Sequence, residues 1–114
     1  AVLAQERQRF ADVFSWIASH LESPGELTVP RLAKVAGLSP SRFQAAFKQE
    51  TGLPPAEFAL RARITEASRR LARPGADVTS VAFDLGFSSS QYFASAFRRY
   101  TNASPREALK KRPG

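Results

Sequence analysis

The sequence contains no cysteine and no methionine, and it has a single histidine, His20. The absence of cysteine excludes disulfide bonds, thiolate zinc sites and cysteine nucleophiles. One histidine leaves too few ligands for a transition-metal site built by the protein alone. The serines and the histidine have no acid and oxyanion hole arranged with them as a hydrolase requires. We therefore expect no metal, no cofactor and no enzymatic activity.

The chain also lacks a long hydrophobic run. A membrane-spanning helix needs about eighteen consecutive apolar residues, and the sequence has no such stretch. Residues 1–9 lack the apolar segment of a secretion signal. These absences predict a cytoplasmic protein without a membrane partner. The first residue is Ala1 rather than methionine, which suggests a processed or excised fragment.

What the sequence does contain is apolar residues and positive charge. Its 114 residues are 43% hydrophobic, with nine phenylalanines, which is enough for one compact domain or two very small subdomains. The formal net charge is +7, and all of the excess lies in residues 61–114, because residues 1–60 balance. A basic half beside a neutral half favours a polyanionic partner, although solubility alone also explains a moderate positive charge.

Hydrophobic residues recur at helical spacing, and no segment alternates as a half-buried strand would, so we expect an all-α fold with about seven helices. The expected helices cover residues 10–21, 29–36, 40–51, 55–72, 78–85 and 89–100, with a last short helix from Pro105. Their expected N-caps are Thr28, Ser39, Asp77, Ser88 paired with Gln91, and Ser104 paired with Glu107. The glycines expected to end them are Gly37, Gly52 and Gly86.

The most informative feature is an internal repeat at a spacing of about fifty residues. Both copies predict a short helix, a glycine turn and a longer helix, as in a helix-turn-helix unit. The first copy contains Ala33, Gly37, Ser39, Phe43, Ala46, Phe47, Thr51, Pro55 and Glu57. After a one-residue insertion, the second matches them with Ala82, Gly86, Ser88, Phe93, Ala96, Phe97, Thr101, Pro105 and Glu107. Where the first copy has Gly52, the second has Asn102, which also tolerates the left-handed conformation.

The phenylalanine pairs of the repeat predict which face of each longer helix is exposed. If Phe43, Phe47, Phe93 and Phe97 form the core, a step of about 100° per residue turns the side chains of the opposite face outward. In the first copy these are Ser41, Ala45 and Lys48, flanked by Gln44 and Gln49. In the second they are Gln91, Ser95 and Arg98, flanked by Ala94 and Arg99. Such faces, with no acid, suit a helix in the major groove of DNA. Glu50 is expected on the inward side or at the helix end.

These residues resemble the DNA-binding domain of the AraC/XylS transcription regulators. The resemblance covers residues 10–110 and is densest over 78–105. It is carried by Leu32-Ala33, Gly37-Leu38-Ser39, Phe43, Phe47-Lys48, Gly52, Pro55, Phe58, Arg63, Ala67, Val81-Ala82, Gly86-Phe87, Ser88, Phe93, Phe97-Arg98 and Ser104-Pro105.

The resemblance implies two helix-turn-helix subdomains joined by a linker helix, in a bacterial regulator located at the nucleoid. We expect the first subdomain over residues 1–53, the linker helix over 54–74 and the second subdomain over 75–114. The implied partner is promoter or operator double-stranded DNA, and family members commonly activate transcription by contacting RNA polymerase. A separate effector or dimerisation domain, which many members carry, is not visible in this chain.

Ten residues are candidates for contacting DNA. Those expected to read bases are Ser41, Gln44, Ala45, Ser90, Gln91 and Ser95. Those expected to contact phosphates are Arg42, Lys48, Arg98 and Arg99. The family often places arginine where this chain has Ala45 and Ser95, so its specificity is expected to depend more on DNA shape.

Other readings of the same residues remain open. Arg69-Arg70 and the run Lys110-Lys111-Arg112 are more often solvated charge than DNA contacts, and Arg63 is expected to bridge the linker helix to a subdomain. The alternative function is a helical protein-interaction module whose basic half docks an acidic partner. A membrane-surface role is less favoured, because the apolar faces are needed for a core.

Overall fold

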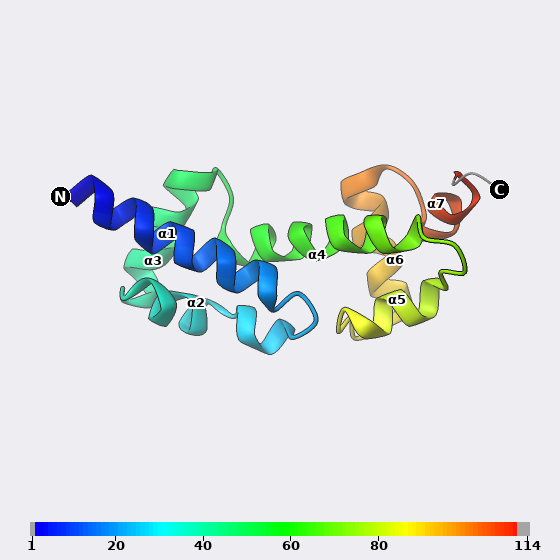
Figure 1. The fold of residues 1–114 in the computed structure, drawn as a ribbon, viewed down its shortest axis with the longest axis horizontal. Coiled ribbons are helices and arrows are strands. Elements are labelled where there is room, and N and C mark those ends of the chain that lie inside the picture. Colours follow the sequence, from blue (N-terminus) through cyan, green and yellow to red (C-terminus); the bar gives the residue numbers. More distant parts are fainter. Residues whose placement is uncertain (1, 112–114) are drawn as a thin grey trace. The chain divides into compact units, whose positions relative to one another are not determined.

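The computed structural model describes residues 2–111 of the chain, and the side chains of residues 4–109. Over these residues the fold is all-α, as predicted, with seven α-helices, one 3-10 helix and no strand (Figure 1). The elements are α1 (Val2–Ser19), η1 (Pro24–Leu27), α2 (Val29–Ala36), α3 (Pro40–Thr51), α4 (Pro55–Leu71), α5 (Val78–Asp84), α6 (Ser90–Thr101) and α7 (Pro105–Lys111). The chain divides into two compact units, residues 1–62 and 63–114, and α4 contributes to both.

The predicted left-handed residues end the helices. Gly37 ends α2 at a φ of 72°, and Gly52 ends α3 at a φ of 83°, a backbone region that residues with a Cβ atom rarely adopt. Asn102 ends α6 at a φ of 62° and is the one non-glycine residue with positive φ among those described. The exchange of glycine for asparagine between the repeats therefore preserves the local geometry.

The N-cap of α6 differs from the prediction. Its capping residue is Ser89, whose hydroxyl accepts a hydrogen bond from the Tyr92 backbone N–H at 3.0 Å, so the expected pairing of Ser88 with Gln91 is wrong. In α3, Ser39 accepts from the Arg42 N–H at 3.4 Å in the same way. The true counterpart of Ser39 is therefore Ser89, fifty residues later. The one-residue insertion lies before Ser89, in the turn between α5 and α6.

The N-terminal region also differs from the prediction. Helix α1 begins at Val2 and ends at Ser19, so it is longer than expected and stops before Leu21. The 3-10 helix was not predicted, because Ser23-Pro24-Gly25 indicates only the end of the preceding helix. Phe14 of α1 is 37% exposed, although its ring lies 5.5 Å from that of Phe58.

The core of the first unit is formed by α1, α2, α3 and the first turns of α4. The ring of Phe47 lies at its centre, 5.3 Å from Phe43 and 5.1 Å from Phe58 between centroids. The other buried side chains around this centre are Val13, Ile17, Leu27, Leu32, Ala33, Ala36 and Ala59. Because Phe43 and Phe47 are fully buried, the opposite face of α3 must point to solvent.

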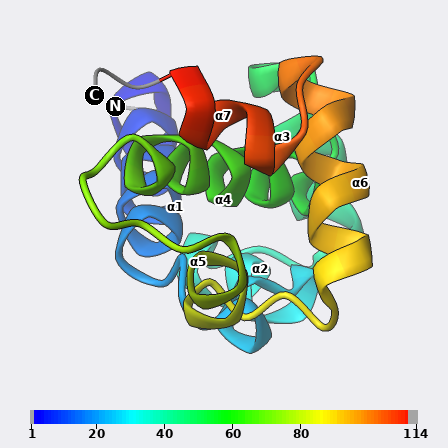
Figure 2. The same cartoon turned by 90° about the vertical axis from the view of Figure 1, so that its right-hand side faces the viewer.

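The second unit repeats this arrangement with α5, α6 and the C-terminal part of α4. Figure 2 views this end of the molecule, with α5, α6 and α7 around α4. Its fully buried large side chains include Ile64, Leu71, Leu85, Phe93 and Phe97. The Phe93 ring lies 4.9 Å from Phe87 and 5.7 Å from Phe97. The prediction that the repeated phenylalanines form the core is confirmed.

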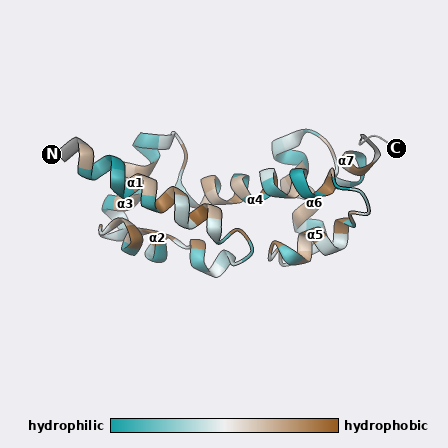
Figure 3. Cartoon of the chain, in the orientation of Figure 1, coloured by the Kyte–Doolittle hydropathy of each residue, from teal (hydrophilic) through white to brown (hydrophobic). Residues whose placement is uncertain are grey.

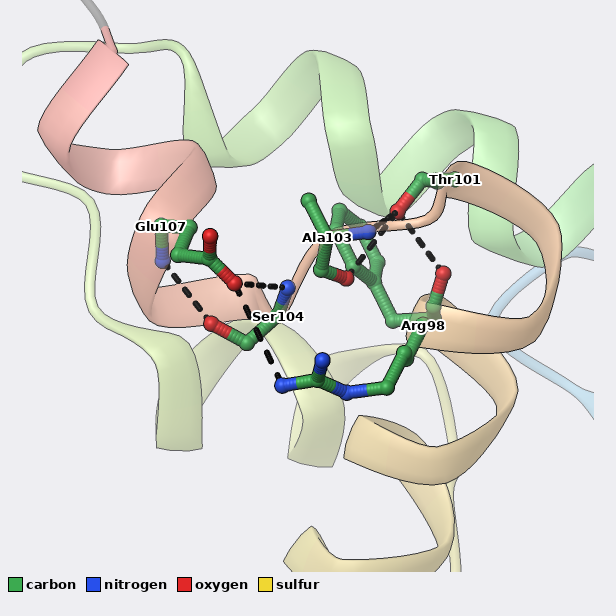
Figure 4. A network of polar contacts seen from close by, with 6 residues as sticks. Arg98, Thr101, Ala103, Ser104 and Glu107 are labelled. Carbon is green, nitrogen blue, oxygen red and sulfur yellow. Dashed lines mark hydrogen bonds and ion pairs between the residues drawn. The ribbon is translucent and has the colours of Figure 1, made fainter.

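A threonine at the end of each longer helix makes the same contacts in both units. The Thr51 hydroxyl lies within donating distance of the Phe47 and Leu53 carbonyls, at 2.9 and 3.0 Å, and it accepts from the Leu53 N–H at 3.1 Å. Thr101 does the same with Phe97 and Ala103 (Figure 4). A hydroxyl that both donates and accepts fixes the chain as it leaves the helix. The repeat therefore extends to hydrogen bonds that residue matching alone does not reveal.

Hydrophilic and hydrophobic residues are interspersed along the helices (Figure 3). Within the described residues, no helix is long and apolar enough to cross a membrane.

Candidate nucleic-acid interface

The outward face of α3 carries the predicted contact residues of the first unit. Ser41, Arg42, Gln44, Ala45 and Lys48 are all exposed. Pro40 at the first helical position and the Ser39 cap set where this helix begins. Its exposed face follows from the burial of Phe43 and Phe47 and was predicted on that basis.

Four of these side chains share one shallow hollow. Ser41, Gln44, Ala45 and Lys48 line it together with Pro54 and Pro55, which precede and begin α4. Its volume is about 420 Å³. The two prolines were not among the predicted contact residues, although their position directly after the helix-turn-helix motif is a signal that the sequence contained.

Arg42 lies apart from this group. It lines a second hollow of about 330 Å³ between α1 and α3, whose lining includes the acids Glu6 and Glu50. Glu50 is exposed near the end of α3, so of its two expected places the helix end is correct. Because the lining that Arg42 shares with Arg9 also contains two carboxylates, we rank Lys48 above Arg42 as a phosphate candidate.

The second unit presents its predicted contact residues on α6. Ser90, Gln91, Ser95, Arg98 and Arg99 are all exposed, whereas Ala94 is half-buried. The Arg99 guanidinium lies 5.1 Å from the centre of the Tyr100 ring. Helix α6 contains no acid, so its exposed face is polar and cationic.

Arg98 reaches an acid on the next helix, within the network drawn in Figure 4. One guanidinium nitrogen, Nη2, lies 4.0 Å from Oε1 of Glu107, and the two side chains are 66% and 55% exposed. Glu107 is fixed by its capping box, because it accepts from the Ser104 N–H at 2.9 Å while Ser104 accepts from the Glu107 N–H at 3.1 Å. An exposed pair at this distance is weak, so Arg98 can exchange Glu107 for a phosphate.

One exposed aromatic residue of α6 was missed. Tyr92 follows Gln91, is 45% exposed, and its ring lies 5.7 Å from that of Phe87. Its hydroxyl gives α6 a further polar group beside a predicted base reader. The helical step that exposes Gln91 and Ser95 places Tyr92 at their edge, which is the signal that could have identified it.

Arg63 supports the turn of the second unit, as predicted. It is 8% exposed and donates from Nε and Nη2 to the Leu85 carbonyl, at 3.2 and 2.8 Å. The guanidinium carbon lies 4.1 Å from the centre of the Phe87 ring. Burial lowers the pKa of Arg63, and the nearby Tyr92 opposes that shift. Arg63 thus holds the turn that positions α6 and lies away from the exposed face.

The basic pair near the end of α4 shares one carboxylate. Glu66 accepts from Nε and Nη2 of Arg69, at 2.9 and 2.6 Å, and from Nε of Arg70 at 2.7 Å. The hydrogen bonds from Arg69, followed by those from Arg70, lower the pKa of Glu66 to about 2 despite partial burial. These two arginines are therefore poorer phosphate candidates than Arg98. The side chains of Lys110-Lys111-Arg112 lie outside the described residues.

Comparison with known proteins agrees with this geometry. A family model described as a helix-turn-helix domain matches residues 32–111. RhaS of Escherichia coli, named an HTH-type transcriptional activator, is 32% identical over 112 residues; the match covers 98% of this chain and 40% of RhaS. The chain therefore spans less than half the length of that relative.

Two solved structures have the same fold. A transcriptional regulator with an AraC-type DNA-binding domain, from Chromobacterium violaceum, superposes with a TM-score of 0.85 at 26% identity, covering 97% of this chain and 99% of that one. The DNA-binding domain of AdpA, a global transcriptional factor in complex with a target DNA, superposes with a TM-score of 0.79 at 30% identity over 88% of each chain. The chain belongs to the AraC-type helix-turn-helix family, whose members bind DNA as transcription regulators.

Proposed function

We propose that this chain recognises a specific double-stranded DNA site by inserting α3 and α6 into major-groove segments. The observation that carries the proposal is the pair of matched helices whose buried phenylalanines expose small, amide and cationic side chains. Side chains of this kind hydrogen-bond to base edges and phosphates. The AdpA domain, which has the same fold, is bound to a target DNA.

We further propose that the stretch 54–74 acts as a linker helix between subdomains at 1–53 and 75–114. Adjacent major-groove segments on one face of DNA lie about 34 Å apart, so a site read by both units extends over roughly twenty base pairs. The protein would act in the bacterial cytoplasm, at the nucleoid. The alternative of a module that docks an acidic protein is not favoured by the family.

The proposed base readers are Ser41, Gln44 and Ala45 of α3 and Ser90, Gln91 and Ser95 of α6. A glutamine amide both donates and accepts, so it can pair with N6 and N7 of an adenine. Replacing Gln91 with alanine should therefore relax base preference at one position of the site by roughly 1–3 kcal/mol. The measurement is a selection of bound sequences from a random duplex pool with the wild-type chain and with Gln91→Ala.

Gln8→Ala provides the control, because Gln8 is an exposed glutamine on α1 that bonds Asp12. It should leave the selected site unchanged. If wild-type protein enriches no site, and scrambled duplex competes as well as the enriched one, site-specific binding is refuted. If Gln91→Ala and the wild type select the same site with the same preferences, only the role of Gln91 is refuted.

The proposed phosphate contacts are Lys48, Arg98 and Arg99, with Arg42 the weakest of the four. Removing one phosphate contact lowers the slope of log affinity against log salt by about 0.9. We expect this of Arg98→Gln, together with weaker binding to every sequence. Arg69→Gln is the matched control, because Glu66 already pairs with Arg69. Equal salt slopes for Arg98→Gln and the wild type would contradict the phosphate role.

We also propose that the domain contributes to activation by contacting RNA polymerase through the exposed face of α5. Phe83 is 79% exposed, and Ser80 and Asp84 are exposed beside it, while Val81 and Ala82 face the core. Large exposed aromatic residues are typical of protein contacts. In the full-length regulator, Phe83→Ala should reduce transcription from the target promoter in vitro with unchanged DNA affinity. If DNA affinity falls by the same factor as transcription, Phe83 belongs to the DNA interface instead.

A further inference from the structure

The two units differ in chemistry at matched positions beside the longer helix. In the first unit, Ala45 of α3 and Pro54 before α4 line the same hollow. Fifty residues on, the corresponding residues are Ser95 of α6 and Ser104 before α7. The first unit therefore has apolar groups where the second has hydroxyls.

The hollow of the first unit is suited to a small apolar group. The exposed Ala45 methyl and Pro54 ring offer no hydrogen-bonding side chain, and a proline has no backbone N–H. Pro55 also lines the hollow, but its side chain is almost fully buried. Ser41, Gln44 and Lys48 supply the polar groups of the lining. An occupant that matches this surface is apolar at one edge and polar around it.

The corresponding position of the second unit carries polar side chains. Ser104 and Glu107 form a capping box there, and Arg98 reaches Glu107 (Figure 4). An apolar group placed against these side chains would displace water from a charged pair and a hydroxyl, which is unfavourable. The two units should thus prefer different chemistry in the groove.

We propose that the hollow lined by Ala45 and Pro54 accepts the C5-methyl group of a thymine, so that the first unit reads a methyl and the second does not. Thymine is the base that displays a methyl group in the major groove, with an oxygen acceptor beside it. The hollow is continuous with the exposed face of α3 that the proposed function places in that groove. The inference therefore rests on the proposed function.

Replacing a thymine with deoxyuridine removes this methyl group and keeps the base pair. Burial of one methyl-sized group contributes about 0.8 kcal/mol, which corresponds to about fourfold in affinity. In the selected site, each thymine is replaced by deoxyuridine in turn. We expect about fourfold weaker binding at one thymine in the half read by the first unit. The base position at which Gln91→Ala relaxes the preference identifies the half that the second unit reads.

Two variants connect the effect to the hollow by giving it the hydroxyls of the second unit. Pro54→Ser is compatible with folding, because the Pro54 carbonyl already accepts from the Phe58 N–H as an N-cap residue does, and serine is favoured at N-caps. Ala45→Ser is the second variant. In both, the preference for thymine over deoxyuridine should fall from about fourfold to near one. Ala18→Ser, at an exposed position of α1, is the matched control and should retain the fourfold preference.

Several results would overturn the inference while site-specific binding stands. One is a selected site without thymine in the half read by the first unit. Another is a change in affinity of less than about 1.5-fold when each thymine there is replaced by deoxyuridine. A third is a preference for thymine that stays about fourfold in both Pro54→Ser and Ala45→Ser. Failure to enrich any site refutes the proposed function itself, and it is seen in the selection before deoxyuridine is used. The two failures are therefore distinguishable.

Discussion

Replacing Phe93 with alanine lowers the free energy of unfolding by about 3–5 kcal/mol, the range for a buried aromatic residue reduced to a methyl group. Phe93 is fully buried, and its ring contacts both Phe87 and Phe97. Phe97 lies on α6 itself, whereas the contact with Phe87 attaches α6 to the turn before it, so the cavity would loosen the helix that carries Gln91 and Arg98. Urea denaturation followed by circular dichroism measures the loss, and hydrogen exchange of the α6 amides shows where it occurs.

Phe83→Ala is the matched control for this experiment. It removes the same atoms from the same unit, but Phe83 is 79% exposed, so its removal should change the free energy of unfolding by no more than about 0.5 kcal/mol. Similar losses for the two variants would mean that Phe93 does not occupy the core as described. A large loss for Phe83 alone would contradict the exposed face of α5.

The helices and the core could be predicted because their signals are local. Phe43, Phe47, Phe93 and Phe97 occur at helical spacing, and Gly37, Gly52 and Asn102 occupy positions that need a left-handed backbone. The cap of α6 was misplaced because Ser88 and Ser89 are adjacent and both are compatible with capping. Only the backbone shows that Ser89 accepts the bond from Tyr92.

The candidate interface was predictable residue by residue but not in its grouping. All ten candidate residues are exposed, and eight of them lie on the faces that helical geometry predicted, the exceptions being Arg42 and Ser90. Helical geometry does not show that Ala45 shares a hollow with Pro54, or that Arg42 shares another with Glu6, because these pairs come from different elements. The salt bridges of Glu66 with Arg69 and Arg70 follow helical spacing and could have been foreseen.

Replacing Arg63 with methionine is expected to lower the free energy of unfolding by about 2–4 kcal/mol. Methionine retains much of the aliphatic bulk but has no donor for the Leu85 carbonyl. That carbonyl lies at the end of α5, where the helix leaves its last carbonyl groups without intrahelical partners. Leu85 is buried, so the oxygen would lose both guanidinium bonds without gaining water in their place.

Arg63→Lys separates the charge from the geometry. Lysine keeps a positive charge but lacks the planar fork that donates twice to Leu85 and stacks on Phe87, so it should restore only part of the lost stability. Arg106→Met is the control on the exposed surface of α7 and should change stability by at most about 0.5 kcal/mol. Full recovery by lysine would show that charge alone suffices. Equal stability of Arg63→Met and the wild type would mean that Arg63 does not hold the turn before α6.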